Sequence, residues 1–206
     1  MARILFVCLG NTCRSPMAAA LGRAYLAGRG VAGVEIASAG EAAFTGDPAP
    51  REAQQALEGY GLSLADHRAQ LLTEEMVAVA DLVLVMSLAQ RDRLRRRWPQ
   101  YAGKIFALKE YAAGADVEAE RARGLELAAR VAAMEREETA GQAQEGRPLA
   151  AAQEVQELAQ VSARLKSYDV TDPLGGGEEA YRRCAKELAE AVTAALARFL
   201  ENTPRA

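Results

Sequence analysis

Short apolar runs alternate with helical stretches along the first half of this chain. We expect strands over 3–8, 34–40, 81–87 and 104–111. The first run, RILFVC, shows no alternation of apolar and polar residues, which is typical of a strand buried on both faces. Strands that alternate with helices pair in parallel through right-handed crossovers. The pattern therefore predicts an α/β fold, a small doubly wound four-stranded parallel sheet with helices on both faces.

Several residues mark where the predicted helices begin. Ser15 and Pro16 open a helix that we expect to reach about Ala27, because serine caps helices well and proline suits the first helical position. Thr73 is expected to cap a short helix in the same way. The last predicted helix is amphipathic and covers about 178–200.

The composition changes between Ala112 and Lys166, where the chain is rich in Ala, Glu, Gln and Arg and has no strand-like run. Apolar residues recur there at helical spacing, and AGQAQEGRP, at 140–148, interrupts the pattern. We predict a single domain over 1–206 with a helical hairpin inserted at 115–166. The two apolar stripes are Leu127, Val131 and Met134, and Val155, Leu158 and Leu165.

The bulk properties narrow the classes of protein to consider. The chain has 206 residues, and a formal net charge of −3 argues against a nucleic-acid binder, which usually carries a basic surface. No apolar stretch is long enough to span a bilayer, so we expect no membrane association. Three cysteines do not suggest a secreted disulfide framework, and we therefore expect a cytoplasmic protein.

The turn after the first predicted strand, LGNTCRSP, holds the most informative residues. Cys8 ends the strand, and Arg14 follows six positions later, just before the expected helix. Loops at the carboxyl ends of parallel strands bind ligands, and their backbone N–H groups cradle anions. A guanidinium binds two phosphate oxygens, and the same positive field favours a thiolate at Cys8. We predict a phosphate-binding loop with a cysteine nucleophile, in which Gly10 permits the turn and Ser15 donates to the sulfur.

A plainer interpretation of this turn stays open at this point. Free cysteines are commonly buried, so Cys8 would be a core thiol and Arg14 a surface charge. Cys13 also has two interpretations, a small packed thiol or a partner in a reversible disulfide that shields Cys8 from over-oxidation. Cys184, on the last predicted helix, is expected to be structural.

The stretch VCLGNTCRSPMA closely resembles the signature of the low-molecular-weight protein phosphatases, C-x-G-N-x-C-R-S-P. That family also carries an Asp-Pro pair late in the chain, and Asp172 and Pro173 match it. The stretches SAG, DLVLVMS and LKEY are similar to the family as well. The resemblance covers about 1–114 and 167–200, which is nearly everything outside the predicted insertion.

The resemblance implies a phosphatase that uses no cofactor and no metal. Cys8 would attack phosphorus to form a phosphocysteine, Arg14 would hold the phosphoryl oxygens, and Asp172 would protonate the leaving group and then activate water. Ser38 and His67 would support the loop, although a lone histidine is more often structural. The implied substrate-binding residues are Leu9, Gly10, Asn11, Thr12, Cys13, Ser15 and Leu174.

Two positions bear on the identity of the substrate. Members that act on phosphotyrosine usually resemble GNICRS, whereas protein arginine phosphatases resemble GNTCRS, and this chain has Thr12. Tyrosine-specific members often place aromatic residues after Asp-Pro, but Leu174 and three glycines follow here. The favoured function is hydrolysis of phosphoarginine on proteins. The alternatives are a phosphotyrosine phosphatase with the same mechanism and, in another class, a phosphoprotein-binding module that uses the insertion.

The insertion leaves the predicted sheet after LKEY and returns just before Asp172, so we expect both of its ends to lie near the acid loop. A hairpin there would shade the cleft, offer a docking face for a phosphorylated protein substrate, or be a solvated decoration.

Overall fold

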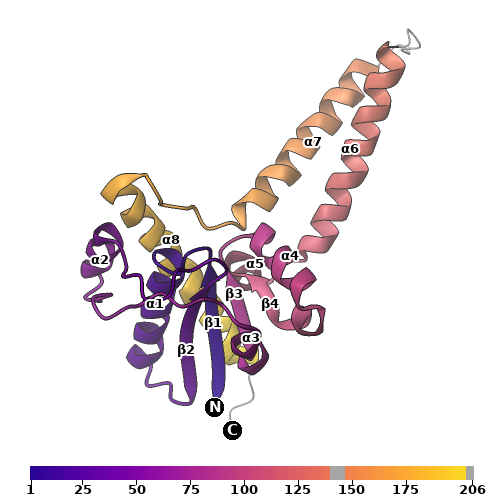
Figure 1. Ribbon diagram of the computed structural model, residues 1–206. Helices are drawn as coiled ribbons and strands as arrows, with labels where there is room; N and C mark the ends of the chain where they lie inside the picture. Colours follow the sequence, from indigo (N-terminus) through magenta and orange to yellow (C-terminus); the bar gives the residue numbers. More distant parts are fainter. Residues whose placement is uncertain (140–146, 203–206) are drawn as a thin grey trace. The chain divides into compact units, whose positions relative to one another are not determined.

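The computed structural model of the protein describes residues 1–139 and 147–202, with the backbone alone at 137–139 and 147–151. The chain separates into two compact units (Figure 1). The sheet unit comprises Met1–Gly114 and Asp169–Ala206, and the hairpin unit comprises Ala115–Tyr168.

The sheet unit contains four strands, all parallel, in the order β2-β1-β3-β4 (Figure 1). In the register, Ile4 of β1 lies beside Ile36 of β2 on one side and Leu82 of β3 on the other. The predicted fold class, a four-stranded parallel sheet with helices on both faces and an inserted helical hairpin, is confirmed. The strands are β1 (Ala2–Cys8), β2 (Val34–Gly40), β3 (Leu82–Val85) and β4 (Ile105–Ala107).

Alternate residues of β1 point to opposite faces of the sheet, and both faces are covered. Ile4 and Phe6 belong to a large apolar cluster with helices α1, α2 and α8. Leu5 and Val7 are also buried and lie on the other face, where α3 and α4 pack. The helices of this unit are α1 (Arg14–Gly28), α2 (Arg51–Glu58), α3 (Glu74–Val79), α4 (Leu88–Arg97), α5 (Leu108–Ala113) and α8 (Gly177–Asn202), with a 3-10 helix, η1, at Pro99–Lys104.

The N-termini of α3 and α1 differ in whether a side chain caps them. Thr73 caps α3 as predicted, because its side chain accepts a hydrogen bond from the Met76 N–H at 3.3 Å. The prediction that Ser15 caps α1 is wrong. The helix begins at Arg14, its N-cap position is Cys13, and no side chain caps it. The hydroxyl of Ser15 is instead engaged inside the preceding loop.

The fourth predicted strand, 104–111, is shorter than expected and turns into a helix. β4 ends at Ala107 and α5 begins at Leu108. The cause is Glu110, whose carboxylate accepts the Ala107 N–H at 2.9 Å and so satisfies the first turn of the helix. The same carboxylate forms an ion pair with the fully buried guanidinium of Arg91 on α4.

The hairpin unit consists of α6 (Val117–Thr139) and α7 (Arg147–Ser167), which run antiparallel. Arg123 pairs with Glu157, and Arg130, further along α6, pairs with Glu154, which comes earlier in α7. The two helices therefore run side by side in opposite directions. The turn predicted at 140–148 falls largely outside the described residues.

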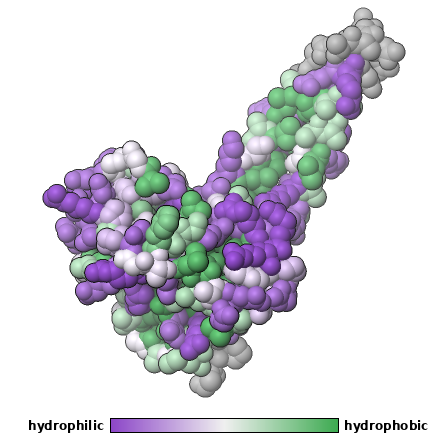
Figure 2. All heavy atoms as spheres, viewed as in Figure 1, coloured by the Kyte–Doolittle hydropathy of each residue, from purple (hydrophilic) through white to green (hydrophobic). Residues whose placement is uncertain are grey.

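One of the two predicted apolar stripes needs correction. Leu127 is fully buried, as the pattern on α6 predicts. Val155 is 50% exposed and does not belong to the interface between the helices. Val161 takes this role, since it packs close to Gly124 of α6. Figure 2 shows hydrophobic residues along both helices with hydrophilic residues among them, as expected for a hairpin exposed to solvent.

The buried ion pair of Arg91 and Glu110 generates a test of the fold. Glu110→Ala leaves the guanidinium of Arg91 without this partner and frees the Ala107 N–H. Because Asp92 still binds the guanidinium of Arg91, we expect the free energy of unfolding to fall by roughly 1.5–3 kcal/mol, measured by urea denaturation. Glu178→Ala removes an exposed ion pair with Arg182 on α8 and should cost less than about 1 kcal/mol. Equal effects of the two substitutions would show that burial of the first pair has no energetic consequence.

Candidate active site

Cys8 lies at the carboxyl end of β1, where the strand order changes direction. The chain passes from β1 to β2 on one side and then to β3 on the other side of β1. Such a point leaves a crevice between the two diverging connections, and open α/β sheets bind ligands there. The loop of residues 8–15, which we call the phosphate loop, occupies this crevice.

Asn11 holds the phosphate loop in its conformation. It is fully buried and has φ of +53°, the one positive φ of a non-glycine residue in the described part of the chain. Its carboxamide nitrogen donates to the hydroxyls of Ser15 and Ser38, both at 2.9 Å. Its carboxamide oxygen accepts the backbone N–H of Gln70 at 2.9 Å. All the hydrogen-bonding groups of this side chain are thus used, which offsets the cost of the left-handed backbone.

The sulfur of Cys8 faces two hydrogen-bond donors. The Asn11 N–H lies 3.2 Å from Sγ, and the hydroxyl of Ser15 lies 3.0 Å from it. Ser15 already accepts a hydrogen bond from the Asn11 carboxamide, and its own O–H is directed at Sγ or at the Ala39 carbonyl, 3.2 Å away. The Asn11 N–H donates to the sulfur and the Ser15 hydroxyl is placed to do the same, which suits a thiolate, since a thiolate can only accept. The core-thiol interpretation of Cys8 does not account for this arrangement.

His67 contacts the back of the same loop. Its Nε2 lies 2.6 Å from the carbonyl oxygen of Asn11, so this nitrogen carries the proton and donates. Partial burial lowers the pKa of His67 below its ordinary value, and the positive charges of Arg23 and Arg68 act in the same direction. The ring is therefore neutral at pH 7. Ser38 and His67 both contact Asn11.

Arg14 and Asp172 come together although 158 positions separate them in the sequence. The guanidinium Nη2 donates to the Asp172 carboxylate at 2.5 Å. The side chain of Arg14 is 11% exposed and that of Asp172 is 48% exposed, so the carboxylate lies on the solvent side of the pair. The structure thus brings together Cys8, Arg14 and Asp172, the three predicted catalytic residues.

The segment that leads to Asp172 is anchored to the sheet unit. The Val170 N–H donates to the Met86 carbonyl at 2.8 Å, directly after β3, and the Leu88 N–H donates to Asp169 at 2.8 Å. Glu187 of α8 accepts the Thr171 N–H at 3.2 Å. Because β3 is the neighbour of β1, these bonds place Asp172 beside the phosphate loop.

The backbone conformation and the local packing explain the three glycines that follow Leu174. Gly175 and Gly177 have positive φ of +80° and +67°. A Cβ on Gly176 would lie 2.5 Å from that of Ala180. The glycines alone therefore say little about the substrate. Leu174, 77% exposed, is the side chain that this turn presents next to Asp172.

The other predicted loop residues differ in exposure. Leu9 is half exposed, and Thr12 is partly buried, with its hydroxyl 3.5 Å from the sulfur of Cys13. Cys13 is a buried free thiol whose sulfur lies 3.3 Å from the Tyr181 hydroxyl. Burial raises the pKa of Cys13 and raises that of Cys184 to about 12. These contacts favour the packed-thiol interpretation of Cys13, and a reversible disulfide with Cys8 stays a prediction.

Sequence reasoning missed two residues that shape the loop. A Cβ on Gly40, at the end of β2, would lie 2.7 Å from both the Asn11 nitrogen and the Leu9 oxygen. Only glycine allows the phosphate loop to pass this close to β2. Gln70 braces Asn11 and Ser38 from a segment with no recognisable motif. Gly40 is the last residue of the SAG stretch, which resembles the family, and this resemblance could have pointed to it.

Two further findings concern the residues that the structure describes. No three His, Cys, Asp or Glu side chains among them approach one another as ligands of one metal ion would. Within the same residues, no helix combines the length and the apolar character needed to cross a membrane.

A cysteine held by hydrogen-bond donors, with an arginine and a carboxylic acid at the same loop, defines the class of cysteine-dependent phosphatases. The family model described as low molecular weight phosphotyrosine protein phosphatase matches residues 3–123. The chain therefore belongs to the low molecular weight protein phosphatase family.

Similar proteins include enzymes with two different names. A probable low molecular weight protein-tyrosine-phosphatase EpsP of Ralstonia nicotianae is 45% identical over 52% of this chain and 70% of its own length. A protein-arginine-phosphatase of Geobacillus stearothermophilus is 43% identical over 55% of this chain and 74% of its own length. A solved structure of the YwlE arginine phosphatase, a cysteine-to-serine mutant with a phosphorylated active-site serine, has a TM-score of 0.68 at 29% identity and covers 98% of both chains.

The close approach of Gly40 to the phosphate loop gives the second prediction. Gly40→Ala forces the Asn11 backbone away from β2, so both the Asn11–Cys8 hydrogen bond and the anion cradle are displaced. We expect kcat/KM for p-nitrophenyl phosphate to fall by roughly 100-fold, with weaker binding of vanadate. Gly59→Ala is the matched control, since φ at Gly59 is −62° and a Cβ there meets no atom within 4 Å. Full activity of the Gly40 variant would disprove the steric argument.

Proposed function

We propose that this protein removes the phosphoryl group from phosphoarginine residues of proteins through a phosphocysteine on Cys8. The observation that carries the proposal is the convergence of Cys8, Arg14 and Asp172 on one loop that carries Thr12. The relative from Geobacillus stearothermophilus named protein-arginine-phosphatase supports the choice of substrate.

In the first step, the substrate phosphoryl group binds at the phosphate loop and takes the guanidinium of Arg14 from Asp172. The Cys8 thiolate forms a bond to phosphorus while the bond between phosphorus and the arginine nitrogen breaks. Asp172, released from Arg14 and protonated from solvent, gives this proton to the departing nitrogen. Arg14 and the loop N–H groups stabilise the charge on the three equatorial oxygens.

In the second step, the phosphocysteine is hydrolysed. Asp172, now ionised, takes a proton from a water molecule whose oxygen attacks phosphorus, and the bond from sulfur to phosphorus breaks. The thiolate leaves readily because the Asn11 N–H donates to it and the Ser15 hydroxyl lies 3.0 Å away, within reach to donate as well. The same carboxyl group thus serves as acid and then as base, and no metal is required.

Thr12 and Leu174 support phosphoarginine over phosphotyrosine. The hydroxyl of Thr12 would accept a hydrogen bond from the planar, polar guanidinium of the substrate, whereas the apolar residue usual in phosphotyrosine members would not. Leu174 offers no aromatic face for a tyrosine ring to stack on. The second candidate, a phosphotyrosine phosphatase, is supported by the 45% identity to the relative named EpsP.

We also propose that the protein acts in the cytoplasm, because a reducing compartment keeps the nucleophile Cys8 a free thiol. The helical insertion at 115–166 would serve as a docking face for the phosphorylated protein substrate. Its exposed apolar residues include Leu125 and Val155, which a substrate protein could cover.

The acid role of Asp172 leads to the third prediction. Asp172→Asn cannot donate a proton, and protonation matters most for a poor leaving group. We expect kcat/KM for phenyl phosphate to fall roughly 100-fold or more, and that for p-nitrophenyl phosphate to fall far less. An equal loss with the two substrates would remove Asp172 from the acid role and leave it as a partner of Arg14.

The choice of substrate is tested by measuring kcat/KM on two peptides that differ only in phosphoarginine or phosphotyrosine. The wild-type protein should prefer the phosphoarginine peptide. Thr12→Ile should move the ratio of the two values toward phosphotyrosine by roughly tenfold or more, because the isoleucine removes a polar contact and adds an apolar one. Thr12→Ser, which keeps the hydroxyl, is the control. A preference of the wild type for phosphotyrosine would establish the second candidate instead.

The role of the insertion is tested by replacing 115–166 with a short Gly/Ser linker. Because residues 169–171 are anchored within the sheet unit, Asp172 should stay in place and turnover of p-nitrophenyl phosphate should persist. A docking face predicts a loss confined to phosphorylated protein substrates. Unchanged kinetics on those proteins would identify the insertion as a decoration, and faster turnover of the small substrate would identify a lid.

A further inference from the structure

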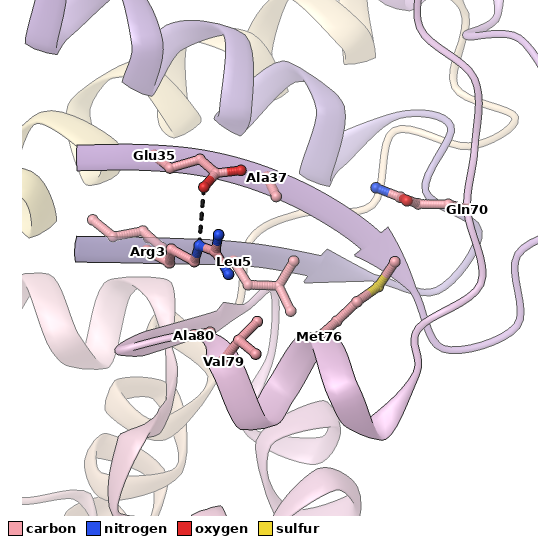
Figure 3. A pocket seen from close by; sticks show the side chains of 9 residues that line it. Arg3, Leu5, Glu35, Ala37, Gln70, Met76, Val79 and Ala80 are labelled. Carbon is pink, nitrogen blue, oxygen red and sulfur yellow. Dashed lines mark hydrogen bonds and ion pairs between the residues drawn. The ribbon is translucent and has the colours of Figure 1, made fainter. Parts of the chain in front are cut away.

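A cavity of about 310 Å³ lies on the face of the sheet that α3 covers (Figure 3). Leu5 of β1 and Ala37 of β2 form its floor, and Met76 and Val79 of α3 form its wall. No residue of the phosphate loop lines it, so it is separate from the active site. A cavity of this size and apolar lining is typical of sites that bind small molecules.

The two ends of the cavity are polar. At one end Arg3 and Glu35 form an ion pair, with 2.9 Å between Nε and Oε2. At the other end the carboxamide of Gln70 points toward the cavity (Figure 3). Its nitrogen donates to the Ser38 carbonyl at 2.7 Å, which fixes the orientation of the amide. The oxygen, Oε1, is therefore the atom that can accept a hydrogen bond from a ligand.

We propose that this cavity binds a small, flat, neutral molecule that is mostly apolar and carries one N–H or O–H donor, directed at Gln70. The sulfur of Met76, which lines the cavity, favours an aromatic and therefore planar ligand. The charges of Arg3 and Glu35 already neutralise each other, so a charged ligand would lack a counterion.

Occupancy of the cavity acts on the phosphate loop through Gln70. The backbone N–H of this residue donates to Asn11, and its side chain donates to the strand residue Ser38, whose hydroxyl also contacts Asn11. A donor on Oε1 polarises the amide and strengthens the bond from its nitrogen to Ser38. A loop that is already rigid loses less entropy when it binds an anion. The ligand therefore tightens phosphate binding, and phosphate tightens ligand binding by the same factor.

Indole is a suitable probe of the site, because it is flat and neutral and has one N–H. We expect saturable binding to the full-length protein, with NMR shifts of the amide signals of Leu5, Ala37 and Val79. 1-Methylindole, which lacks the donor, should bind roughly three- to tenfold more weakly. Val79→Trp fills the cavity from an exposed position and should abolish binding, whereas Leu125→Trp, an exposed substitution on α6, should not. Absence of saturable binding, or equal binding to the Val79 variant, would overturn the site.

The coupling is measured by calorimetric titration with inorganic phosphate, with and without saturating indole. We expect about fivefold tighter phosphate binding in the presence of indole, and no effect of indole in Val79→Trp. Phosphate affinity that is unchanged while indole is bound would overturn the connection through Gln70. A self-associated protein in which α3 is covered by a second copy would also overturn the proposal. Neither titration depends on which phosphorylated residue the enzyme hydrolyses.

Discussion

The carboxamide of Asn11 is the contact on which the geometry of the active site depends. It joins three parts of the sheet unit: the start of α1 through Ser15, the strand β2 through Ser38, and the segment after α2 through Gln70. Without these bonds, a buried asparagine with positive φ would be both strained and unsatisfied. With them, the Asn11 N–H is directed at the Cys8 sulfur. The loop is therefore arranged before any phosphate binds, so little reorganisation accompanies the reaction.

Strand order explains why the remaining groups meet at this loop. β1 lies between β2 and β3, so the residues that follow these neighbours lie on either side of Cys8. Gly40 ends β2 and lets the loop approach, and the segment before Asp172 bonds to Met86 just after β3. The acid thus reaches the loop from a distant part of the sequence through hydrogen bonds within the sheet unit. Because these bonds hold the acid loop, the chain tolerates a long insertion directly before it.

The sequence predicted the structure correctly where a local pattern of residues is typical of one structural role. Apolar strands that alternate with helices predicted the fold, a cysteine and an arginine six positions apart predicted a phosphate-binding loop, and Thr73 predicted a helix cap. Predictions were wrong where a side chain was engaged elsewhere. Ser15 bonds within the loop instead of capping α1, and Glu110 ends β4 early because it binds Arg91 and the Ala107 N–H.

The remaining misses concern contacts that no local pattern encodes. Gln70 supports the loop from a segment that has no periodicity. The need for glycine at position 40 comes from another loop that passes within van der Waals distance. On α7, Val155 and Val161 both fit a helical stripe, and only the partner helix decides which one is covered. Each of these depends on tertiary packing.

The central claim is that the thiolate of Cys8, held in a loop arranged in advance, takes the phosphoryl group from the substrate. Its most direct test is to quench the protein during turnover of a phosphoarginine peptide and to map the phosphate by mass spectrometry. The account predicts a phosphoryl group on Cys8. Turnover with no adduct on Cys8, or with the phosphate on another residue, would contradict it.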